Sequence, residues 1–145
     1  KVVLDSRLRI SEKARMLKQF HTLVATTSQA SVAKIKRLRN QGVEVVIFPR
    51  SRGQVSLPAV LAELGRRELT NVLIEGGARV IGSALKERVV DRMMMVVAPK
   101  ILGDHRALSA VEGLNILDVN KAVRVDVEHV KEIGGDWVFE GDVRY

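Results

Sequence analysis

One short stretch has residue types and spacing that could hold a charged ligand: residues 71–82, Asn-Val-Leu-Ile-Glu-Gly-Gly-Ala-Arg-Val-Ile-Gly. An apolar run typical of a strand ends at Glu75, passes through Gly76 and Gly77, and continues with helical spacing. Two glycines at such a junction let a ligand approach the backbone, and the first turn of the helix offers free N–H groups and the positive end of its dipole. The stretch therefore predicts a phosphate or pyrophosphate cradle with a carboxylate beside it, at the carboxyl end of a strand.

Strand and helix signals alternate along the chain around this stretch. Apolar and β-branched runs predict strands at residues 2–4, 22–26, 44–48 and 69–75. Residues 27–31, Thr-Ser-Gln-Ala-Ser, supply N-cap candidates for a first helix, which Gly42 is expected to end. Ser56 is expected to cap a second helix, and both segments have apolar residues at helical spacing. The expected apolar faces are Val32, Ile35 and Leu38 in the first helix, and Leu57, Val60, Leu61 and Leu64 in the second. This alternation predicts right-handed crossovers and a parallel sheet.

The C-terminal part of the chain has a different pattern. Residues 93–99 form an uninterrupted apolar run, which predicts a strand buried on both faces. Residues 123–130 and 136–143 alternate apolar and charged side chains, which is typical of an antiparallel hairpin, and Gly134-Gly135 lies in the connection. We therefore expect an α/β fold with a mixed sheet, mainly parallel with an antiparallel C-terminal hairpin, and with helices on both faces.

Composition restricts the class of protein. The chain has 145 residues, 46% hydrophobic and 28% charged, which fits one globular domain, and it has no cysteine for disulfides or thiolate metal sites. No apolar run reaches the roughly 18 residues of a membrane span, and no signal peptide is evident, so we expect a cytoplasmic protein without a membrane partner. Because Lys1 leads directly into a strand without an initiator Met, the sequence is expected to be part of a longer protein.

The charge balance favours anionic partners. The formal net charge is +7 and the pI is about 10.1. Basic residues are spread along the chain and only 3% of residues are aromatic, so a phosphorylated small molecule is favoured over nucleic acid. The basic segments at residues 5–9, Asp-Ser-Arg-Leu-Arg, and 50–54, Arg-Ser-Arg-Gly-Gln, could each contact a phosphate. On local sequence alone, an ordinary surface loop is the commoner interpretation of both.

Several chemistries lack their motifs. The chain has no Walker sequence ending in Gly-Lys-Ser/Thr, no zinc deaminase signature and no Gly-x-Gly-x-x-Gly turn after its first strand. We predict no metal site. Of the histidines, only His105 is a candidate for catalysis, and no catalytic residue is assigned. Gly82, inside the expected helix after the glycine turn, costs about 1 kcal/mol relative to alanine and therefore indicates close packing or close approach of a ligand.

An ordered set of segments carries a family resemblance. Residues 2–9, Val-Val-Leu-Asp-Ser-Arg-Leu-Arg, are followed by Ala25-Thr26-Thr27, by residues 73–77, Leu-Ile-Glu-Gly-Gly, and by residues 98–103, Ala-Pro-Lys-Ile-Leu-Gly. This set resembles the reductase of riboflavin biosynthesis, which includes the C-terminal half of the bacterial bifunctional deaminase-reductase and stand-alone archaeal enzymes. The resemblance implies a fold similar to dihydrofolate reductase. It also implies an NADPH-dependent reduction of the ribosyl group of a 5-phosphoribosylamino-pyrimidine to a ribityl chain.

The resemblance also implies roles for particular residues. Ser6 matches a cofactor contact on the adenosine side, and Glu75 matches a carboxylate that contacts the substrate. The cofactor loop corresponds to Gly76, Gly77, Ala78, Arg79, Val80, Ile81, Gly82 and Ser83. From their chemistry, Arg7 and either Thr27 or Ser28 are candidates for contacts to the 2′-phosphate of NADPH.

The chain departs from the family pattern at its start. Family members begin with about seventy further residues that supply much of the substrate pocket, and residues 1–145 are therefore expected to be a reductase domain without its N-terminal portion. We also expect a homodimer. The alternatives are another dihydrofolate-reductase-like enzyme acting on a pteridine or pyrimidine, and a non-catalytic nucleotide-binding module. Whether the substrate would be deaminated or still aminated is left open.

Overall fold

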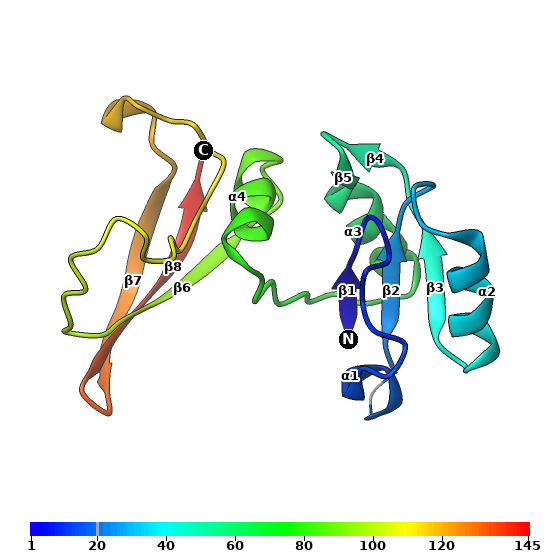
Figure 1. The fold of residues 1–145 in the computed structure, drawn as a ribbon. Coiled ribbons are helices and arrows are strands. Elements are labelled where there is room, and N and C mark those ends of the chain that lie inside the picture. Colours follow the sequence, from blue (N-terminus) through cyan, green and yellow to red (C-terminus); the bar gives the residue numbers. More distant parts are fainter. Residues whose placement is uncertain (20) are drawn as a thin grey trace. The chain divides into compact units, whose positions relative to one another are not determined.

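The computed structural model describes residues 1–19 and 21–145, and the chain divides into two compact units (Figure 1). Unit 1 comprises Lys1–Asn71 and unit 2 comprises Val72–Tyr145. Within the described residues, no helix is long and apolar enough to cross a membrane.

A parallel three-stranded sheet forms the centre of unit 1. Its strands are β1 (Val2–Leu4), β2 (Leu23–Thr26) and β3 (Glu44–Ile47), in the order β1-β2-β3. Val24 of β2 is paired with Val3 on one side and with Val45 on the other. The predicted parallel sheet is therefore confirmed for its first three strands.

Two helices of unit 1 begin at N-cap residues, and Gly42 ends one of them as predicted. The helices of this unit are α1 (Arg15–Gln19), α2 (Val32–Asn40) and α3 (Leu57–Arg66). The side chains of Ser31 and Ser56 each accept a hydrogen bond of 3.4 Å from the backbone N–H three residues later, which identifies them as N-caps. Gly42, at φ +81°, follows α2 and lets the N–H of Val43 donate back to the carbonyl of Leu38 at 3.0 Å.

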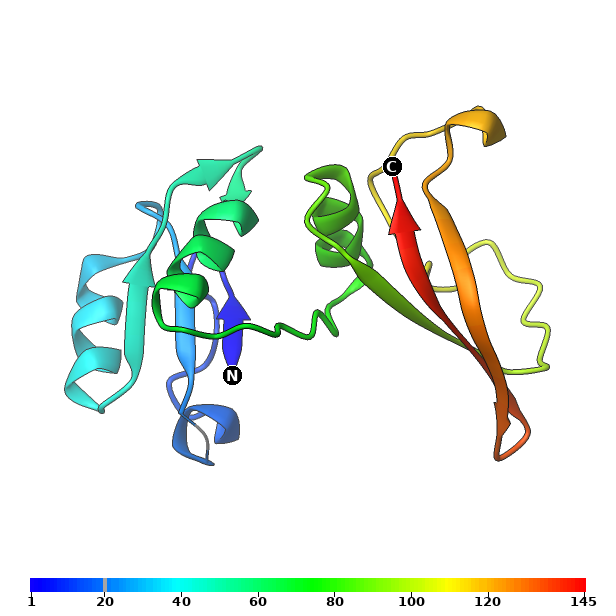
Figure 2. The same cartoon turned by 180° about the vertical axis from the view of Figure 1, so that it is seen from behind.

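Alternation along β2 builds a separate core on each face of this sheet. Val24 packs with the buried side chains of α2, Ile35 and Leu38. Its neighbours Leu23 and Ala25 belong to the cluster on the other face, which includes Val60 and Leu64 of α3. Helices thus cover both faces, as predicted, and α3 lies behind the sheet in Figure 1 and in front of it in Figure 2. The prediction was wrong for Val32, the first residue of α2, which is 80% exposed and does not belong to the cluster.

Residues 50–55 form a short antiparallel ribbon that the sequence interpretation described only as a loop. Its strands are β4 (Arg50–Ser51) and β5 (Gln54–Val55), joined by Arg52 and Gly53 at φ +52° and +81°. Two successive residues with positive φ make the type I′ turn that matches the twist of a two-residue hairpin. The ribbon lies at the end of unit 1 toward which β1, β2 and β3 run (Figures 1 and 2).

The predicted strand at residues 69–75 is wrong. This segment is extended but irregular, and no described strand pairs with it. Leu73 is 82% exposed, and Leu69 and Val72 are also exposed. Apolar character predicts that a segment prefers burial, but a strand also needs a neighbour to accept and donate its backbone hydrogen bonds.

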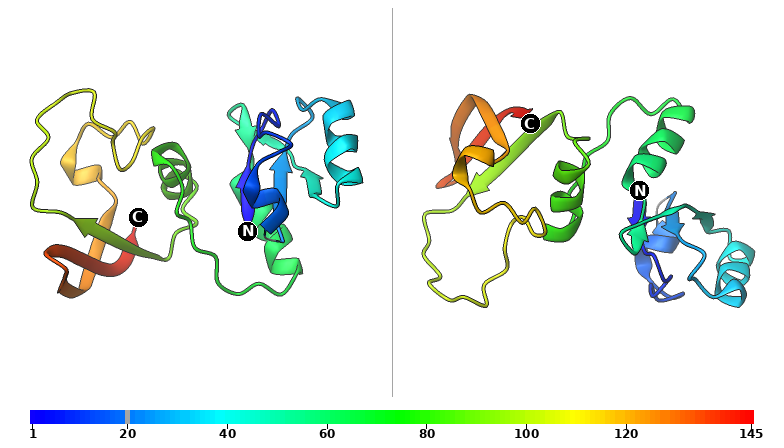
Figure 3. Two further views of the ribbon diagram at one scale, coloured as in Figure 1. Left: turned by 60° about the horizontal axis from the view of Figure 1, so that its bottom comes forward. Right: turned by 90° about the horizontal axis from the view of Figure 1, so that it is seen from above.

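Unit 2 consists of one α-helix, one short 3-10 helix and an antiparallel three-stranded sheet. The α-helix is α4 (Ala78–Lys86), and the strands are β6 (Arg92–Val97), β7 (Arg124–Ile133) and β8 (Asp136–Arg144), in the order β6-β8-β7. The predicted hairpin is confirmed: β7 and β8 are antiparallel and are joined by Gly134 and Gly135, both with positive φ. Before β7, the long loop of residues 98–118 runs out from β6 and back, and it is followed by the short 3-10 helix η1 (Val119–Lys121) (Figure 3).

Strand β6 is less enclosed than its apolar sequence predicts. Met93 and Met95 are partly buried, whereas Met94 is 64% exposed, and Val96 is exposed on the same side. The expectation that both faces are buried is therefore wrong within unit 2. Alternate residues of a strand face opposite sides of the sheet, and only one side of β6 is partly covered here.

Close backbone contacts explain two glycines of unit 2. A Cβ added at Gly82 would overlap the carbonyl oxygen of Glu112, and a Cβ at Gly141 would overlap the carbonyl oxygen of Asp126. The N–H of Glu112 also donates to the carbonyl of Ala78 at 3.0 Å, so the loop of residues 110–113 lies directly against α4. Of the two explanations that the sequence left open for Gly82, the structure provides the close packing.

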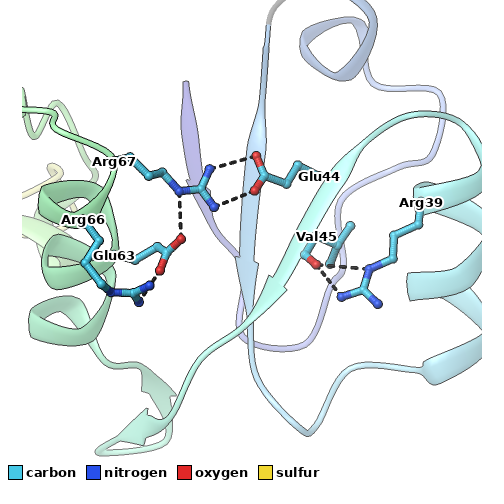
Figure 4. Close-up of polar contacts among 6 residues, drawn as sticks. All are labelled: Arg39, Glu44, Val45, Glu63, Arg66 and Arg67. Atoms are coloured by element: carbon cyan, nitrogen blue, oxygen red, sulfur yellow. Dashed lines mark hydrogen bonds and ion pairs between the residues drawn. The ribbon is translucent and has the colours of Figure 1, made fainter.

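An ion-pair network joins α3 to the first residue of β3. The Arg67 guanidinium makes a bidentate pair with Glu44, at 2.6 and 3.0 Å, and donates through Nε to Glu63 at 2.8 Å (Figure 4). Arg66 pairs with Glu63 as well, and Arg39 donates to the carbonyl of Val45. The hydrogen bonds from Arg67 hold the pKa of Glu44 below its ordinary value.

We predict that Arg67→Gln lowers the free energy of unfolding at neutral pH, because it removes the bidentate pair with Glu44 and the hydrogen bond to Glu63. The folded-state pKa of Glu44 is lowered, so its contribution is present above the unfolded-state pKa and is lost as the pH falls through the folded-state pKa. The difference between variant and wild type should therefore shrink below about pH 4 in urea unfolding curves. Arg66→Gln is the control, and an equal loss in both variants would contradict the assignment to Glu44.

A second prediction concerns the helix glycines. Gly82→Ala should lower the free energy of unfolding by about 1–3 kcal/mol, because the new methyl group must displace backbone at Glu112. Gly65 of α3 is the matched control, since a Cβ added there meets no atom within 4 Å. Gly65→Ala should raise stability by up to about 1 kcal/mol through helix propensity. Urea unfolding of both variants tests the pair, and a stabilising Gly82→Ala would disprove the packing role.

Candidate functional site

The loop of residues 5–10 turns sharply at the carboxyl end of β1. The N–H of Asp5 donates to the carbonyl of Ala25 at 2.9 Å, and the N–H of Leu8 donates to the carbonyl of Asp5 at 3.0 Å. The carboxylate of Asp5 accepts from the N–H of Ile10 at 2.7 Å. Asp5 thus closes the loop from inside and leaves the intervening residues Ser6 and Arg7 at its tip.

Two threonine hydroxyls at the end of β2 hold this loop from the other side. Thr26 Oγ1 donates to the carbonyl of Asp5 and Thr27 Oγ1 donates to the carbonyl of Ser6, both at 2.7 Å. Both threonines are 0% exposed. A hydroxyl has one proton to donate, so Thr27 in this arrangement has none for a phosphate, and its role here is to fix the loop.

Ser6 links the loop to the β4–β5 ribbon. Its Oγ accepts a hydrogen bond of 3.0 Å from the N–H of Val55, which still leaves the hydroxyl proton free to be donated. The predicted cofactor contact by Ser6 is therefore compatible with its position. Arg7 and Ser28 are exposed near the same strand ends, and their predicted contacts to a 2′-phosphate stay predictions.

Leu8 adopts a left-handed backbone conformation, which the sequence does not predict. Its φ is +54°, in the left-handed region that a bulky residue rarely occupies, and its side chain is buried in the cluster beside α2. The left-handed backbone costs about 1–2 kcal/mol, which burial of the leucine side chain offsets. The loop is therefore held in one conformation by its core as well as by its hydrogen bonds.

In unit 2, the glycine turn leads directly into α4. Gly77 is the N-cap of α4 at φ +72° and ψ +138°, and its carbonyl accepts from the N–H groups of Val80 and Ile81. Among the described residues, no acceptor pairs with the N–H groups of Ala78 and Arg79. A Cβ added at Gly77 meets no atom within 4 Å, so the backbone here is open to a ligand. These features are what the predicted anion cradle requires.

The other residues predicted around this turn have different surroundings. Glu75 is exposed, and within the described part of the chain no cation pairs with it. The Arg79 side chain pairs with Glu112 at 3.2 Å, so its guanidinium helps to hold the loop of residues 110–113. Gly76 packs against Val80, whose Cβ lies 3.0 Å from the position of an added Cβ.

Ile81, Gly82 and Ser83 lie one turn further along α4, away from the free N–H groups. Gly82 is buried against Glu112, and Ser83 is partly buried. Ile81 faces an apolar cavity of about 920 Å³ in unit 2, lined mainly by aliphatic and methionine side chains of α4, β6 and residues 110–125. Their predicted cofactor contacts stay predictions, and the packing described here accounts for Ile81 and Gly82 without a ligand.

The two units therefore each present polar groups suited to anions: hydroxyls and arginines in unit 1, and backbone N–H groups in unit 2. Across residues 1–19 and 21–145, no group of three His, Cys, Asp or Glu side chains could hold a metal ion. The tie between Ser6 and the ribbon, and the left-handed Leu8, were missed by sequence reasoning. The only local signal for the ribbon was Gly53 after Arg52, in a two-residue turn.

Comparison with known proteins identifies relatives of the whole chain. Residues 1–139 match the family of the RibD C-terminal domain. The chain is 30% identical over 139 residues to the riboflavin biosynthesis protein RibD of Actinobacillus pleuropneumoniae. The matched region covers 94% of this chain and 37% of that protein. It is 29% identical over 135 residues to the 2,5-diamino-6-ribosylamino-4(3H)-pyrimidinone 5′-phosphate reductase of Archaeoglobus fulgidus, covering 92% of this chain and 58% of that one.

Solved structures show the same fold. RibD of Acinetobacter baumannii superposes with a TM-score of 0.82 at 23% identity, covering 99% of this chain and 37% of that one. A pyrimidine reductase-like protein of Corynebacterium diphtheriae gives a TM-score of 0.82 at 22% identity, covering 99% and 60%. The predicted dihydrofolate-reductase-like α/β class is thus confirmed as a fold. The chain spans little more than a third of its bacterial relatives, and because the family match runs through almost all of it, the chain belongs to the RibD C-terminal domain family.

Proposed function

We propose that this chain contributes to an NADPH-dependent reductase of riboflavin biosynthesis, which reduces the ribosyl group of a 5-phosphoribosylamino-pyrimidine to ribityl. The observation that supports this most directly is the start of α4, where Glu75-Gly76-Gly77 precedes two free backbone N–H groups in a chain of this family. The archaeal relative is named as a reductase of such a pyrimidinone phosphate, which is the same class of substrate.

The residues at the start of α4 fit a pyrophosphate. The open space at Gly77 lets an anion reach the N–H groups of Ala78 and Arg79, and the dipole of α4 adds favourable potential there. Ser6, with its free hydroxyl proton, would contact the adenosine part of the cofactor, and Arg7 and Ser28 its 2′-phosphate. This proposal assigns Thr27 to holding Ser6 rather than to the phosphate.

In this reduction, the role of the protein is to bind the substrate and the cofactor and to align them with each other. Opening of the ribosylamine ring gives an imine at C1′ of the substrate, and bound NADPH supplies the hydride that reduces it. Glu75 would bind the substrate's amino groups and stabilise the positive charge that the imine carries when protonated. Orientation of substrate against cofactor then provides much of the rate enhancement. A homodimer and a cytoplasmic location belong to the same proposal.

Titration of the intact protein with NADPH and with NADH tests this function, followed by loss of the reduced-nicotinamide absorbance on addition of the phosphoribosylaminopyrimidine. Binding of NADPH without oxidation would instead favour a non-catalytic nucleotide-binding module. Oxidation with a different pteridine or pyrimidine alone would favour another dihydrofolate-reductase-like enzyme. Comparing the deaminated with the aminated pyrimidine identifies the substrate form.

We predict that Glu75→Gln in the intact protein lowers kcat/KM for the pyrimidine by about tenfold or more, because an amide cannot replace a charge-assisted hydrogen bond. The Kd for NADPH should change little. Glu132→Gln removes an exposed carboxylate elsewhere in unit 2 and is the control. Unchanged steady-state kinetics in Glu75→Gln would remove Glu75 from the substrate site.

A further inference from the structure

Arginines collect at one end of unit 1. We call residues 5–10, 27–31 and 48–56, which follow β1, β2 and β3, the carboxyl-end loops. They contain four arginines, Arg7, Arg9, Arg50 and Arg52, and one acidic residue, Asp5. The carboxylate of Asp5 is turned to the backbone N–H of Ile10, at 2.7 Å. In the part of the chain that the structure describes, no carboxylate pairs with Arg7, Arg50 or Arg52, all of which are exposed.

The other carboxylates of unit 1 are mostly paired elsewhere. Glu44 stands at the start of β3, at the opposite end of the sheet, and binds Arg67. Glu63 is shared by Arg66 and Arg67 of the same network, and Glu12 pairs with Arg37 of α2 at 3.0 Å. The carboxyl-end loops are therefore left with positive charge that internal carboxylates do not neutralise, which favours an external anion.

The ribbon is fixed beside the loop of β1. The Val55 N–H donates to Ser6 Oγ at 3.0 Å, and the N–H of Ser56 donates to the carbonyl of Pro49 at 2.9 Å, which closes the base of the ribbon. Val55 itself is buried in the core beside α3. Arg50 and Arg52 are thus carried on an element that is anchored at the strand ends, next to the loop that carries Arg7 (Figures 1 and 2).

Arg52 occupies a turn position whose left-handed backbone conformation is unusual for arginine. It is the first residue of the type I′ turn, at φ +52°, where Asn, Asp or Gly is preferred. Its left-handed backbone costs about 1 kcal/mol, and in the described structure its side chain makes no hydrogen bond or ion pair that offsets this cost. Strained residues cluster at ligand-binding sites, and Arg52 combines a strained backbone with an exposed cation at the tip of an anchored ribbon.

We propose that Arg50 and Arg52 of the ribbon, together with Arg7, form a site for a phosphate monoester dianion carried by a nucleotide or sugar. Guanidinium groups bind such phosphates through paired, charge-assisted hydrogen bonds. The phosphate could come from the 2′-phosphate of NADPH or from the 5′-phosphate of the pyrimidine. That identification rests on the proposed function, whereas the phosphate site itself rests on unit 1 alone. The ribbon then determines which phosphorylated ligand the protein selects.

The test uses Arg50→Gln, Arg52→Asn and their double variant in the intact protein. Asn suits the left-handed turn, so Arg52→Asn should fold at least as stably as the wild type, which urea unfolding checks. Binding of 2′-AMP, NADPH and NADH is measured by calorimetry, and the KM for the phosphorylated pyrimidine is measured where turnover occurs. Each variant should weaken binding of the phosphate-bearing ligand by about tenfold, with little change for NADH.

Lys18→Ala/Lys36→Ala is the control, because it removes two exposed positive charges from α1 and α2 and should change every affinity by less than about twofold. Loss of NADPH and 2′-AMP binding identifies the 2′-phosphate, and a raised KM for the pyrimidine alone identifies the substrate phosphate. Arginine-dependent 2′-AMP binding without reductase activity would support the site while refuting the proposed function. Wild-type affinity of the double variant for all these ligands would overturn the proposal.

Discussion

The carboxyl-end loops of unit 1 depend on two buried hydroxyl groups at the end of β2. Thr26 donates to the carbonyl of Asp5, which also accepts from the N–H of Leu8, and Thr27 donates to the carbonyl of Ser6. Each such bond adds only about 1 kcal/mol of net stability, but leaving a buried partner unsatisfied costs about 1–3 kcal/mol. Because Ser6 also accepts from the N–H of Val55, Thr27 helps to fix the ribbon through Ser6. Two buried threonines therefore help to fix the positions of the loop of residues 5–10 and of the β4–β5 ribbon.

Unit 2 shows two uses of glycine in one helix. Gly77 has positive φ and open space around it, so it gives a ligand access to free N–H groups. Gly82, five residues later, is required because the backbone of Glu112 packs where a side chain would be. Gly77 is the N-cap of α4 and Gly82 lies within it, and only Gly77 belongs to the predicted anion cradle. Glycine spacing alone cannot separate these roles, because the second depends on a loop thirty residues away in sequence.

The sequence predicted the structure correctly where interactions within a short segment determine it. Ser31, Ser56 and Gly42 set the helix ends through local hydrogen bonds, and the alternation in β7 and β8 required a hairpin. It failed at residues 69–75, because a strand is defined by a neighbour that the segment itself does not contain. It also missed the left-handed Leu8, whose conformation is maintained by burial among residues from α2 and β3.

Charge is a further property that the fold reorganises. Along the sequence, the basic residues are spread without an evident cluster. The net charge of +7 therefore does not indicate where on the protein an anion would bind. In unit 1, folding brings Glu44 and Glu63 together with Arg66 and Arg67 at one end. Asp5, the acidic residue of the carboxyl-end loops, is bonded to the backbone at the other end. The positive potential at the carboxyl-end loops therefore depends on which arginines the carboxylates of unit 1 pair with. An exposed arginine attracts an external phosphate most strongly when no carboxylate of the protein is paired with it.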